Sequence, residues 1–359
     1  MKDAKNSQGI TWQHIALTVL CVVLALILFA IVGLTIYANH LLGLITDNGD
    51  GYLNATMSPE DLATFGDDYD GTPITGPSID HSDVVQSTVP STPKEDLPEG
   101  VINILLIGED RRPYETTRQR SDSMILCSIN TKKNTITMVS FLRDIYISNI
   151  PGYNRPQKLN AAYAMGGAAC LKQTLAAYFG VHVDATVAVD FNGFIQIIDM
   201  LGGVNIELTK AEAKHLNDTR YADIYGDDLQ TVYAGTNHLN GKTALAYSRI
   251  RKLDWDGKRT ERQRNVITAL INAYKSKGVA EMAILASDIL STGFIKTDMT
   301  QEQVIDYVWA IAPMLSTATI SSQYIPLDDT STDANVGNIV DCKVIDLEVN
   351  RRFLKTILQ

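Results

Sequence analysis

Carboxylates and arginines recur at the ends of apolar segments in the middle of this 359-residue chain. Asp110 follows one apolar run, Arg120 and Asp122 open the next, and Arg143 and Asp144 follow a third. Carboxylate oxygens suit hard divalent cations, whereas the planar guanidinium fork suits phosphate oxygens. The mixture therefore predicts a metal-bridged pyrophosphate site. The alternative is a set of structural Arg–Asp pairs, which contribute little when they are exposed.

A second group of arginines lies in residues 247–264, YSRIRKLDWDGKRTERQR. Arg249 and Arg251 are two residues apart, so they share one face if the segment is extended. A helix is predicted to follow, and its N-terminus would add N–H donors for an anion. Helical spacings of three and four place three further side chains on one face of it: Arg259, Arg262 and Gln263. Arg264 points elsewhere, and we expect it to be a solvated surface charge.

The elements that must position these side chains follow from the hydrophobic pattern. Short β-branched runs predict buried strands, and longer periodic segments predict helices. Their alternation predicts an α/β fold, an α/β/α sandwich with a central mixed, largely buried sheet, in which ligands collect beyond the strand ends. The predicted strands lie at 101–108, 122–129, 135–142, 183–190, 204–208 and 319–326, and the helices at 159–179, 191–201, 260–278, 279–292, 300–315 and after 347.

The N-terminal region predicts one membrane anchor. Residues 15–37 carry no charge, and 23 helical residues at about 1.5 Å each span a hydrocarbon core of about 30 Å. Lys2 and Lys5 precede this segment, so the positive-inside rule places residues 1–14 in the cytoplasm and the rest of the chain outside the cell. We therefore expect a single-pass protein of the cell membrane.

Residues 38–100 are predicted to form an acidic, flexible extracellular tether, and residues 101–359 the extracellular catalytic domain. From 46 to 100 there are twelve acidic residues against one basic residue, Lys94, in a segment without amphipathic periodicity. Removing this charge of −11 from the formal net charge of −10 leaves about +1 for the remaining residues. The folded body is thus close to neutral, which argues against a nucleic-acid-binding protein.

The four cysteines show no metal-binding or redox pattern. Cys21, Cys127, Cys170 and Cys342 include no C-x-x-C pair. We expect them to be small buried apolar residues.

The ordered motifs of the domain resemble the LytR-CpsA-Psr family over roughly residues 101–275. They are NILLIGED, RQRSDSM, SFLRDIYI, KLNAAYAMGG, VDFNGF, IDMLGGV, HLNGKTALAYSRIR and RTERQR. Members of this family are membrane-anchored phosphotransferases of Gram-positive bacteria. The resemblance implies transfer of an anionic glycopolymer, of teichoic acid or capsular type, from a polyprenyl-pyrophosphate carrier to the C6 hydroxyl of N-acetylmuramic acid in peptidoglycan.

The resemblance also implies roles for individual residues. Asp110 and Asp122 match the ligands of Mg²⁺ (or Mn²⁺), and Arg143 matches the most important pyrophosphate-binding position. Asp122 or Asp144 is our candidate for the general base, although a bound cation would make Asp122 a poorer base. The other residues that match pyrophosphate-binding positions are Arg120, Arg249, Arg251, Arg259, Arg262 and Gln263.

Three aromatic residues are candidates for lining a pocket for the polyprenyl chain: Tyr163, Phe191 and Phe194. The alternative is that they belong to the ordinary core. The sequence departs from the family pattern in two places. Leu142 stands where proline is frequent, and DWDGKR lacks an aromatic-Gly pair directly before Arg259, so the positions of Asp256 and Arg259 follow less directly from the resemblance.

Two other functions fit the same residues. A metal-dependent pyrophosphatase or hydrolase would use the same site with water as the acceptor. A non-enzymatic sensor would bind the lipid or the polymer without turnover.

Overall fold

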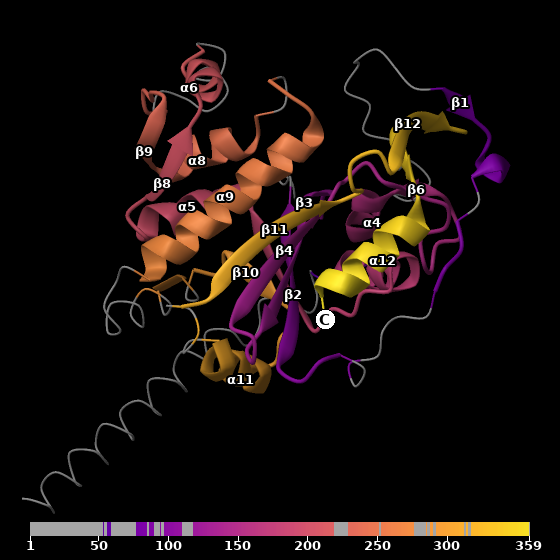
Figure 1. Ribbon diagram of the computed structural model, residues 1–359, viewed down its shortest axis with the longest axis horizontal. Coiled ribbons are helices and arrows are strands. Elements are labelled where there is room, and N and C mark those ends of the chain that lie inside the picture. Colours follow the sequence, from indigo (N-terminus) through magenta and orange to yellow (C-terminus); the bar gives the residue numbers. More distant parts are fainter. Residues whose placement is uncertain are drawn as a thin grey trace, which may run out of the picture. The chain divides into compact units, whose positions relative to one another are not determined.

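A computed structural model describes most of the chain beyond residue 96 (Figure 1). The described ranges are 97–109, 118–218, 229–250, 253–275, 292–311 and 317–358, with shorter stretches at 53, 56–58, 77–84, 86–89, 94, 285, 288–289 and 314. All of them belong to one compact unit, residues 47–359. The predicted cytoplasmic tail and membrane segment, residues 1–37, lie outside the described residues, and no described helix is long and apolar enough to cross a bilayer.

Six of the described strands form a central mixed sheet in the order β10-β7-β2-β3-β4-β11. Strands β2, β4, β7 and β11 run in one direction, and β3 and β10 run in the opposite one. The carboxyl ends of the four parallel strands therefore meet at one edge of the sheet, where β3 begins. The strands are β2 (Val101–Glu109), β3 (Ser121–Asn130), β4 (Thr135–Phe141), β7 (Ala185–Asp190), β10 (Ile295–Thr297) and β11 (Thr319–Ile325).

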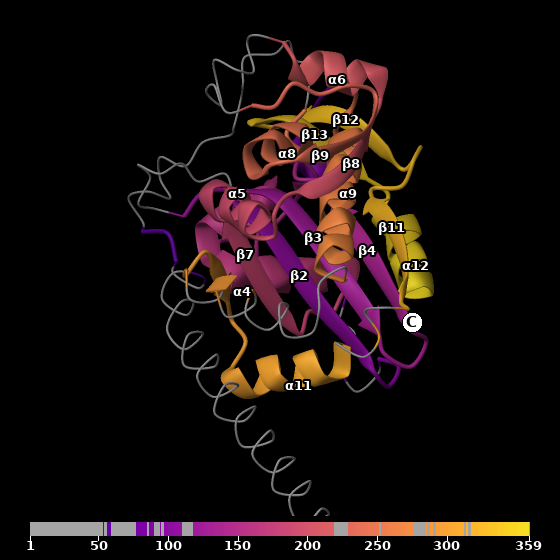
Figure 2. The ribbon, with the colours of Figure 1, turned by 90° about the vertical axis from the view of Figure 1, so that its left-hand side faces the viewer.

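Helices cover both faces of the sheet, as an α/β/α sandwich requires. Helices α4 (Leu159–Phe179) and α12 (Leu347–Ile357) lie on one face. Helices α5 (Phe191–Met200), α8 (Gly241–Ser248) and α9 (Asp256–Lys275) lie on the other, in front of the sheet in Figure 2. Side chains alternate between the faces, so Leu105 and Ile107 of β2 pack beneath α4, whereas Ile104 and Leu106 point to the opposite side.

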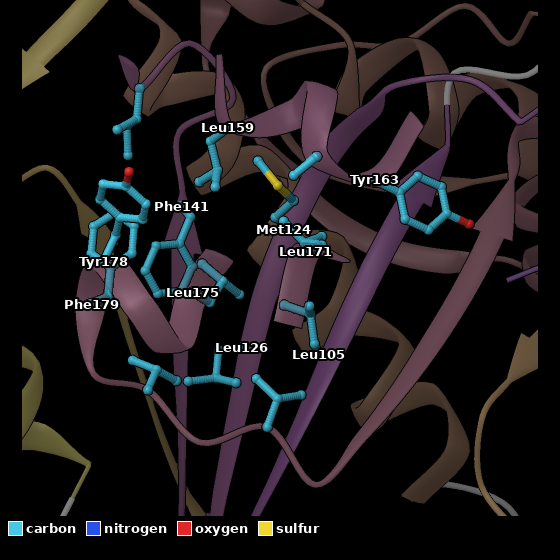
Figure 3. Packing of buried hydrophobic residues seen from close by; sticks show 14 of the residues in the cluster. Leu105, Met124, Leu126, Phe141, Leu159, Tyr163, Leu171, Leu175, Tyr178 and Phe179 are labelled. Carbon is cyan, nitrogen blue, oxygen red and sulfur yellow. The ribbon is translucent and has the colours of Figure 1, made fainter. Parts of the chain in front are cut away.

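The larger core lies between the sheet and helix α4 (Figure 3). Leu105, Met124, Leu126 and Phe141 come from the strands and meet apolar side chains of the helix. The sequence predicts this helix with the same bounds, in spite of two internal glycines. Gly166 and Gly167 do have an effect, because their backbone angles are non-helical and the helix is kinked there.

Smaller elements surround the sandwich. Helix α11 (Gln301–Ile311) lies near the end of the sheet opposite the strand carboxyl ends (Figures 1 and 2). Strands β8 (Val204–Leu208) and β9 (Gly235–Leu239) form an antiparallel pair, and α6 (Lys210–Leu216) lies between them in the sequence. Two further small sheets and a short 3-10 helix complete the described elements: β1 (Ser78–Ile79), η1 (His81–Asp83), β5 (Tyr146–Ile147), β6 (Gln157–Lys158), β12 (Ser331–Val336) and β13 (Ile339–Ile345).

The predicted tether is not extended and solvated along its whole length. Ser78 and Ile79 form strand β1, which pairs in parallel with β12. Ile79 and Val84 pack against a small cluster around Cys342, and the side chain of Gln86 bonds the backbone of Tyr146 and Ser148. These few apolar residues and backbone groups find partners on the domain, so the acidic composition of the segment does not keep it solvated here.

Candidate active site

The predicted convergence at the strand ends is present around Arg143. This residue follows β4 by two positions, and Asp122 is the second residue of β3. The Arg143 Nη1 donates to Asp122 Oδ1 at 2.7 Å, and its Nε donates to Asp144 Oδ2 at 3.4 Å. The Lys158 Nζ lies 3.6 Å from Asp144 Oδ1. Two carboxylates thus hold the guanidinium of Arg143 from both sides.

The surroundings of Arg143 keep it charged. Burial is the largest single influence on its pKa and favours the neutral form. The negative charges of Asp144, Asp122 and Asp256 together outweigh burial and raise the pKa above the ordinary arginine value. Arg120, directly before β3, is also buried. The edge of the sheet therefore holds fixed positive charge in a partly dehydrated place, where charges interact more strongly than in water.

A cavity of about 230 Å³ opens beside this group of charges. Strands β2, β3 and β7 form one wall, and helices α5, α8 and α9 form the other. The apolar lining residues are Leu106, Ile107, Ile125, Val187, Val189, Phe191, Phe194, Leu245 and Ile267. The polar and glycine lining residues are Gly108, Asp122, Ser123, Asp190, Ser248, Arg249, Arg259 and Gln263. An apolar chamber with cationic and amide groups on its wall suits a ligand with an apolar tail and an anionic head.

Phe191 and Phe194, two of the three candidates for a lipid pocket, lie in this lining at the start of α5. The Cζ atom of Arg249 lies 4.3 Å from the centroid of the Phe191 ring, a cation–π contact that orients the guanidinium. Asp190 caps the helix by accepting from the Gly193 N–H at 2.9 Å.

Tyr163 lies elsewhere. It belongs to α4 and is fully buried in the core on the opposite face of the sheet, where the Arg118 Cζ lies 5.3 Å from its ring centroid (Figure 3). The alternative for Tyr163, a residue of the ordinary core, matches this position.

The described part of YSRIR, up to Arg249, is not an extended strand. Helix α8 includes Tyr247 and Ser248, and Arg249 is its C-terminal cap. Arg249 therefore reaches the cavity from a helix end rather than from one face of a strand. Arg251 and Asp110 lie outside the described residues.

Helix α9 contributes two of its predicted residues to the cavity. Arg259 and Gln263, four positions apart, share one face with Ile267, and all three line the cavity. Arg259 is 2% exposed, and its Nη2 lies 2.9 Å from Asp256 Oδ1. The helix starts at Asp256 rather than at 260, so Asp256 occupies its first turn and orients Arg259.

Arg262 faces away from the cavity lining. Its Nε donates to Glu212 Oε1 at 2.7 Å, and its Nη1 donates to Asp254 Oδ1 at 3.0 Å and to the Ile250 carbonyl at 3.2 Å. A further bond joins its Nη2 to Asp254 Oδ2. These bonds occupy the guanidinium, so its position does not support the predicted contact with pyrophosphate.

The expectation for Arg264 is wrong. It is 4% exposed rather than solvated, and its Nη1 donates to the Ser140 Oγ of β4 at 2.7 Å and to Thr260 Oγ1 at 3.2 Å. Burial is the main cause of its lowered pKa. The part of α9 that carries Arg264 packs against the sheet at Ser140 of β4, which is why this charge is buried.

Only one of the two predicted metal ligands, Asp122, lies within the described residues. No group of three or more His, Cys, Asp or Glu side chains that could hold a metal ion occurs in the described part of the chain. Asp122 lines the cavity and offers carboxylate oxygen, the atom type that Mg²⁺ prefers. Asp190 is a second carboxylate residue of the lining, where it caps α5, and Asp110 directly follows the end of β2 in the sequence.

Sequence reasoning missed Lys158 and Asp190. Lys158 lies in the quoted motif KLNAAYA, immediately before α4, and its side chain is almost fully buried beside Asp144. A lysine directly before an apolar helical segment was the available signal. Asp190 ends an apolar strand at the same sheet edge as Arg143. The rule that ligands collect beyond strand ends could therefore have found it.

Comparison with known proteins places this arrangement in a family. The family model described as "LytR_cpsA_psr family" matches residues 76–348. The polyisoprenyl-teichoic acid–peptidoglycan teichoic acid transferase TagU of Bacillus anthracis is 33% identical over 210 residues, which cover 57% of this chain and 63% of TagU. The chain thus spans less than two thirds of the length of this curated relative.

Solved structures share the fold. A protein from Streptococcus agalactiae, gbs0355, superposes with a TM-score of 0.59 and 26% identity, covering 72% of this chain and 88% of that one. TagT bound to LIIa-WTA gives a TM-score of 0.58 and 25% identity, covering 76% and 95%. The mixed sheet with flanking helices is therefore an architecture that these proteins have in common.

Proposed function

The chain belongs to the LytR_cpsA_psr family, and on that premise we propose that it is a phosphotransferase acting on a polyprenyl-pyrophosphate-linked anionic glycopolymer. The acceptor is the C6 hydroxyl of N-acetylmuramic acid in peptidoglycan. The name of TagU, a polyisoprenyl-teichoic acid–peptidoglycan teichoic acid transferase, supports both substrates. The chemistry is a displacement at phosphorus, in which the acceptor oxygen bonds to the phosphoryl group as the bond to polyprenyl phosphate breaks.

The observation that carries this proposal is the cavity, whose lining is both apolar and charged. Apolar side chains of the sheet and α5 offer room for the polyprenyl chain, and Arg249 and Arg259 offer positive charge to the pyrophosphate. A purely polar pocket would not accept the lipid, and a purely apolar one would not accept the head group. The cavity matches both halves of the donor.

Arg143 supplies positive charge where negative charge develops. Because Asp122 and Asp144 hold it in place, it does not have to reorganise as the phosphoryl group is transferred. Asp144 lies between Arg143 and Lys158, and its carboxylate pairs with both cations. Its geometry therefore favours an orienting role, and Asp122 is the described candidate base that lines the cavity.

We assign a Mg²⁺ (or Mn²⁺) site to Asp122 together with Asp110. The carboxylate chemistry fits a hard cation, and the cation would neutralise charge on the phosphate oxygens. Asp122 would then be held both by the cation and by Arg143. We also propose the predicted topology, with the catalytic domain outside the cell and the anchor in the cell membrane, because the donor is a membrane lipid.

An in vitro transfer reaction tests this function. The purified full chain is incubated with a polyprenyl-pyrophosphate-linked glycopolymer, Mg²⁺ and peptidoglycan fragments, and the products are separated by mass. We expect a covalent glycopolymer–peptidoglycan phosphodiester. Release of free glycopolymer at the same rate with and without peptidoglycan would show a hydrolase instead. Binding of the donor without any product would show a sensor.

A further inference from the structure

An exposed tryptophan is held in a fixed position at the start of α9. Trp255 is 47% exposed, and its ring meets Tyr324 edge to face, with centroids 5.2 Å apart. Its ring also lies directly against Gly257, where a Cβ atom would come within 1.9 Å of the indole carbons. Gly257 therefore makes room for the ring. Exposed aromatic side chains usually have rotamer freedom, and this one is confined by its neighbours.

The aromatic pair lies beside the charged edge of the sheet. Tyr324 of β11 is paired in register with Ser140 of β4, three residues before Arg143. Trp255 directly precedes Asp256, whose negative charge acts on Arg143 and whose side chain holds Arg259. Both aromatic residues are thus at the rim of the site, although neither lines the cavity.

The strand order fixes the side on which this pair lies. The cavity is lined by β7, β2 and β3, Arg143 follows β4, and Tyr324 belongs to β11, which comes next in the order. Arg143 therefore lies between the cavity and the aromatic pair. In phosphoryl transfer the attacking and leaving oxygens are roughly in line on opposite sides of phosphorus. If the leaving polyprenyl phosphate occupies the cavity, the acceptor approaches from the side of Trp255 and Tyr324.

We propose that Trp255 and Tyr324 form a stacking surface for a sugar ring of the acceptor glycan. One face of a pyranose ring carries several C–H groups with slight positive charge, and the faces of aromatic rings are negative. The Tyr324 hydroxyl donates to Asp328. This hydroxyl and carboxylate lie beside the rings, where sugar hydroxyls could bond to them. This assignment rests on the proposed phosphotransferase function, because it takes the direction of attack from that reaction.

Two substitutions test the stacking surface without touching the residues that face the donor. Trp255→Ala removes the ring, and Gly257→Ala displaces it by introducing the Cβ that the indole excludes. Alanine is also a better helix former than glycine, so Gly257→Ala should not weaken α9. We expect each to raise the KM for peptidoglycan fragments roughly three- to ten-fold, the size of one aromatic stacking contact. The double variant should be no worse than Trp255→Ala alone.

Trp309→Ala is the matched control, since Trp309 is 66% exposed on α11, near the opposite end of the sheet. Its KM for the acceptor should stay within two-fold of wild type. Trp255→Phe should restore most of the affinity for the acceptor. An unchanged acceptor KM in Trp255→Ala would overturn the proposal. So would an equal weakening of donor binding, because the aromatic pair would then serve the donor sugar.

A binding measurement separates this proposal from the proposed function. Soluble oligomers of N-acetylglucosamine are titrated into the protein without donor, and tryptophan fluorescence is recorded. We expect a saturable change in fluorescence. The change should be absent in Trp255→Phe, because this variant lacks the indole that reports binding, and present in Trp309→Phe. Saturable binding without any transfer would leave the stacking surface standing and reject the transferase. Transfer without this binding signal, together with an unchanged acceptor KM in Trp255→Ala, would confirm the transferase and reject the stacking surface.

Discussion

At the scale of the residue, Arg143 is distinguished by the two carboxylates that hold it. Asp122 and Asp144 fix the guanidinium from opposite sides, and their charges raise its pKa although burial acts against them. A lysine at this position would keep the charge and lose the planar fork that reaches both carboxylates. The geometry of Arg143, and not only its charge, is therefore what we expect the reaction to need.

We expect Arg143→Lys to lower kcat for transfer by roughly 10²-fold, the effect of removing one preorganised charged group, with a smaller change in donor affinity. Arg352→Lys is the matched control, because Arg352 lies exposed on α12 and pairs only weakly with Glu348. Steady-state kinetics of both variants check this. A kcat for Arg143→Lys within three-fold of wild type would refute a role for the fork.

Single residues also show where sequence patterns stop being informative. The rule that ligands collect at strand ends found Arg143 and Asp122 because the ends of parallel strands meet at one edge. Helical spacing found Arg259 and Gln263 but could not tell which face of α9 meets the cavity. Arg262 and Arg264 directly flank the cavity-lining Gln263, and their buried partners Glu212 and Ser140 are distant in sequence.

At the scale of elements, Arg262 joins three segments that are separate in the sequence. From α9 it reaches Glu212 of α6, the Ile250 carbonyl after α8, and Asp254 before α9. The same Glu212 closes a capping box with Thr209, so its two oxygens serve α6 and α9 at once. The segment that carries Arg249 is thus attached to a buried ionic network.

A double-mutant cycle distinguishes this role from direct binding of pyrophosphate. Arg262→Met and Glu212→Gln should each destabilise the protein, because each leaves a buried partner uncompensated, at a cost of about 3–5 kcal/mol. The double variant should lose clearly less than the sum, as measured by urea unfolding. Additive losses in stability, with donor affinity reduced in Arg262→Met but unchanged in Glu212→Gln, would point to direct contact with the anion.

The pH dependence of stability should report the same network. Burial alone would raise the pKa of Glu212, but hydrogen bonds from the Thr209 backbone and from Arg262 outweigh it and lower the pKa. The unfolded state then binds the proton first as the pH falls. The stabilisation is complete above the ordinary glutamate value of about 4.3 and is lost as the pH falls through the lower folded value.

We therefore expect the free energy of unfolding of wild type to decrease below about pH 4.3 more steeply than that of Glu212→Gln. Denaturant unfolding at a series of pH values from 3 to 7 measures both slopes. Glu348→Gln provides the control, since Glu348 is exposed on α12. Equal acid slopes in wild type and Glu212→Gln would show that this carboxylate is not linked to stability.

The sequence predicts those helices and strands whose side chains are apolar and periodic. Helix α4 and strands β2, β3, β4, β7, β8 and β11 lie within a few residues of their predicted bounds. Helix α8 was missed because GKTALAYS is short and has no clear apolar stripe. Strand β9, with the sequence GTNHL, is polar and is defined by its pairing with β8, a contact that no local pattern reports.

At the scale of the whole molecule, part of the predicted tether belongs to the folded domain. Strand β1 pairs with β12, and Ile79 and Val84 pack on the cluster around Cys342. The family match also begins at residue 76, before the predicted start of the domain at 101. Composition could not show this, because two strand residues and a few apolar contacts are a small fraction of an acidic segment.

Removing this portion should therefore lower stability. A chain that starts at residue 101 should unfold at a Tm roughly 2–8 °C below that of a chain that starts at residue 72, since burial of Ile79 and Val84 and the β1 pairing are lost. Thermal unfolding followed by circular dichroism provides the comparison. Identical Tm values would mean that residues 77–89 do not contribute to the stability of the domain.

Binding of the lipid donor is the most direct test of the central claim, that the cavity between the sheet and helices α5, α8 and α9 holds a polyprenyl pyrophosphate. Native mass spectrometry of the full chain with a polyprenyl pyrophosphate should show one bound lipid. Leu245→Trp, which adds bulk to the apolar lining, and Arg249→Ala, which removes a positive charge from the lining, should each weaken binding at least ten-fold. Undiminished binding in both variants would place the donor elsewhere and contradict the proposed site.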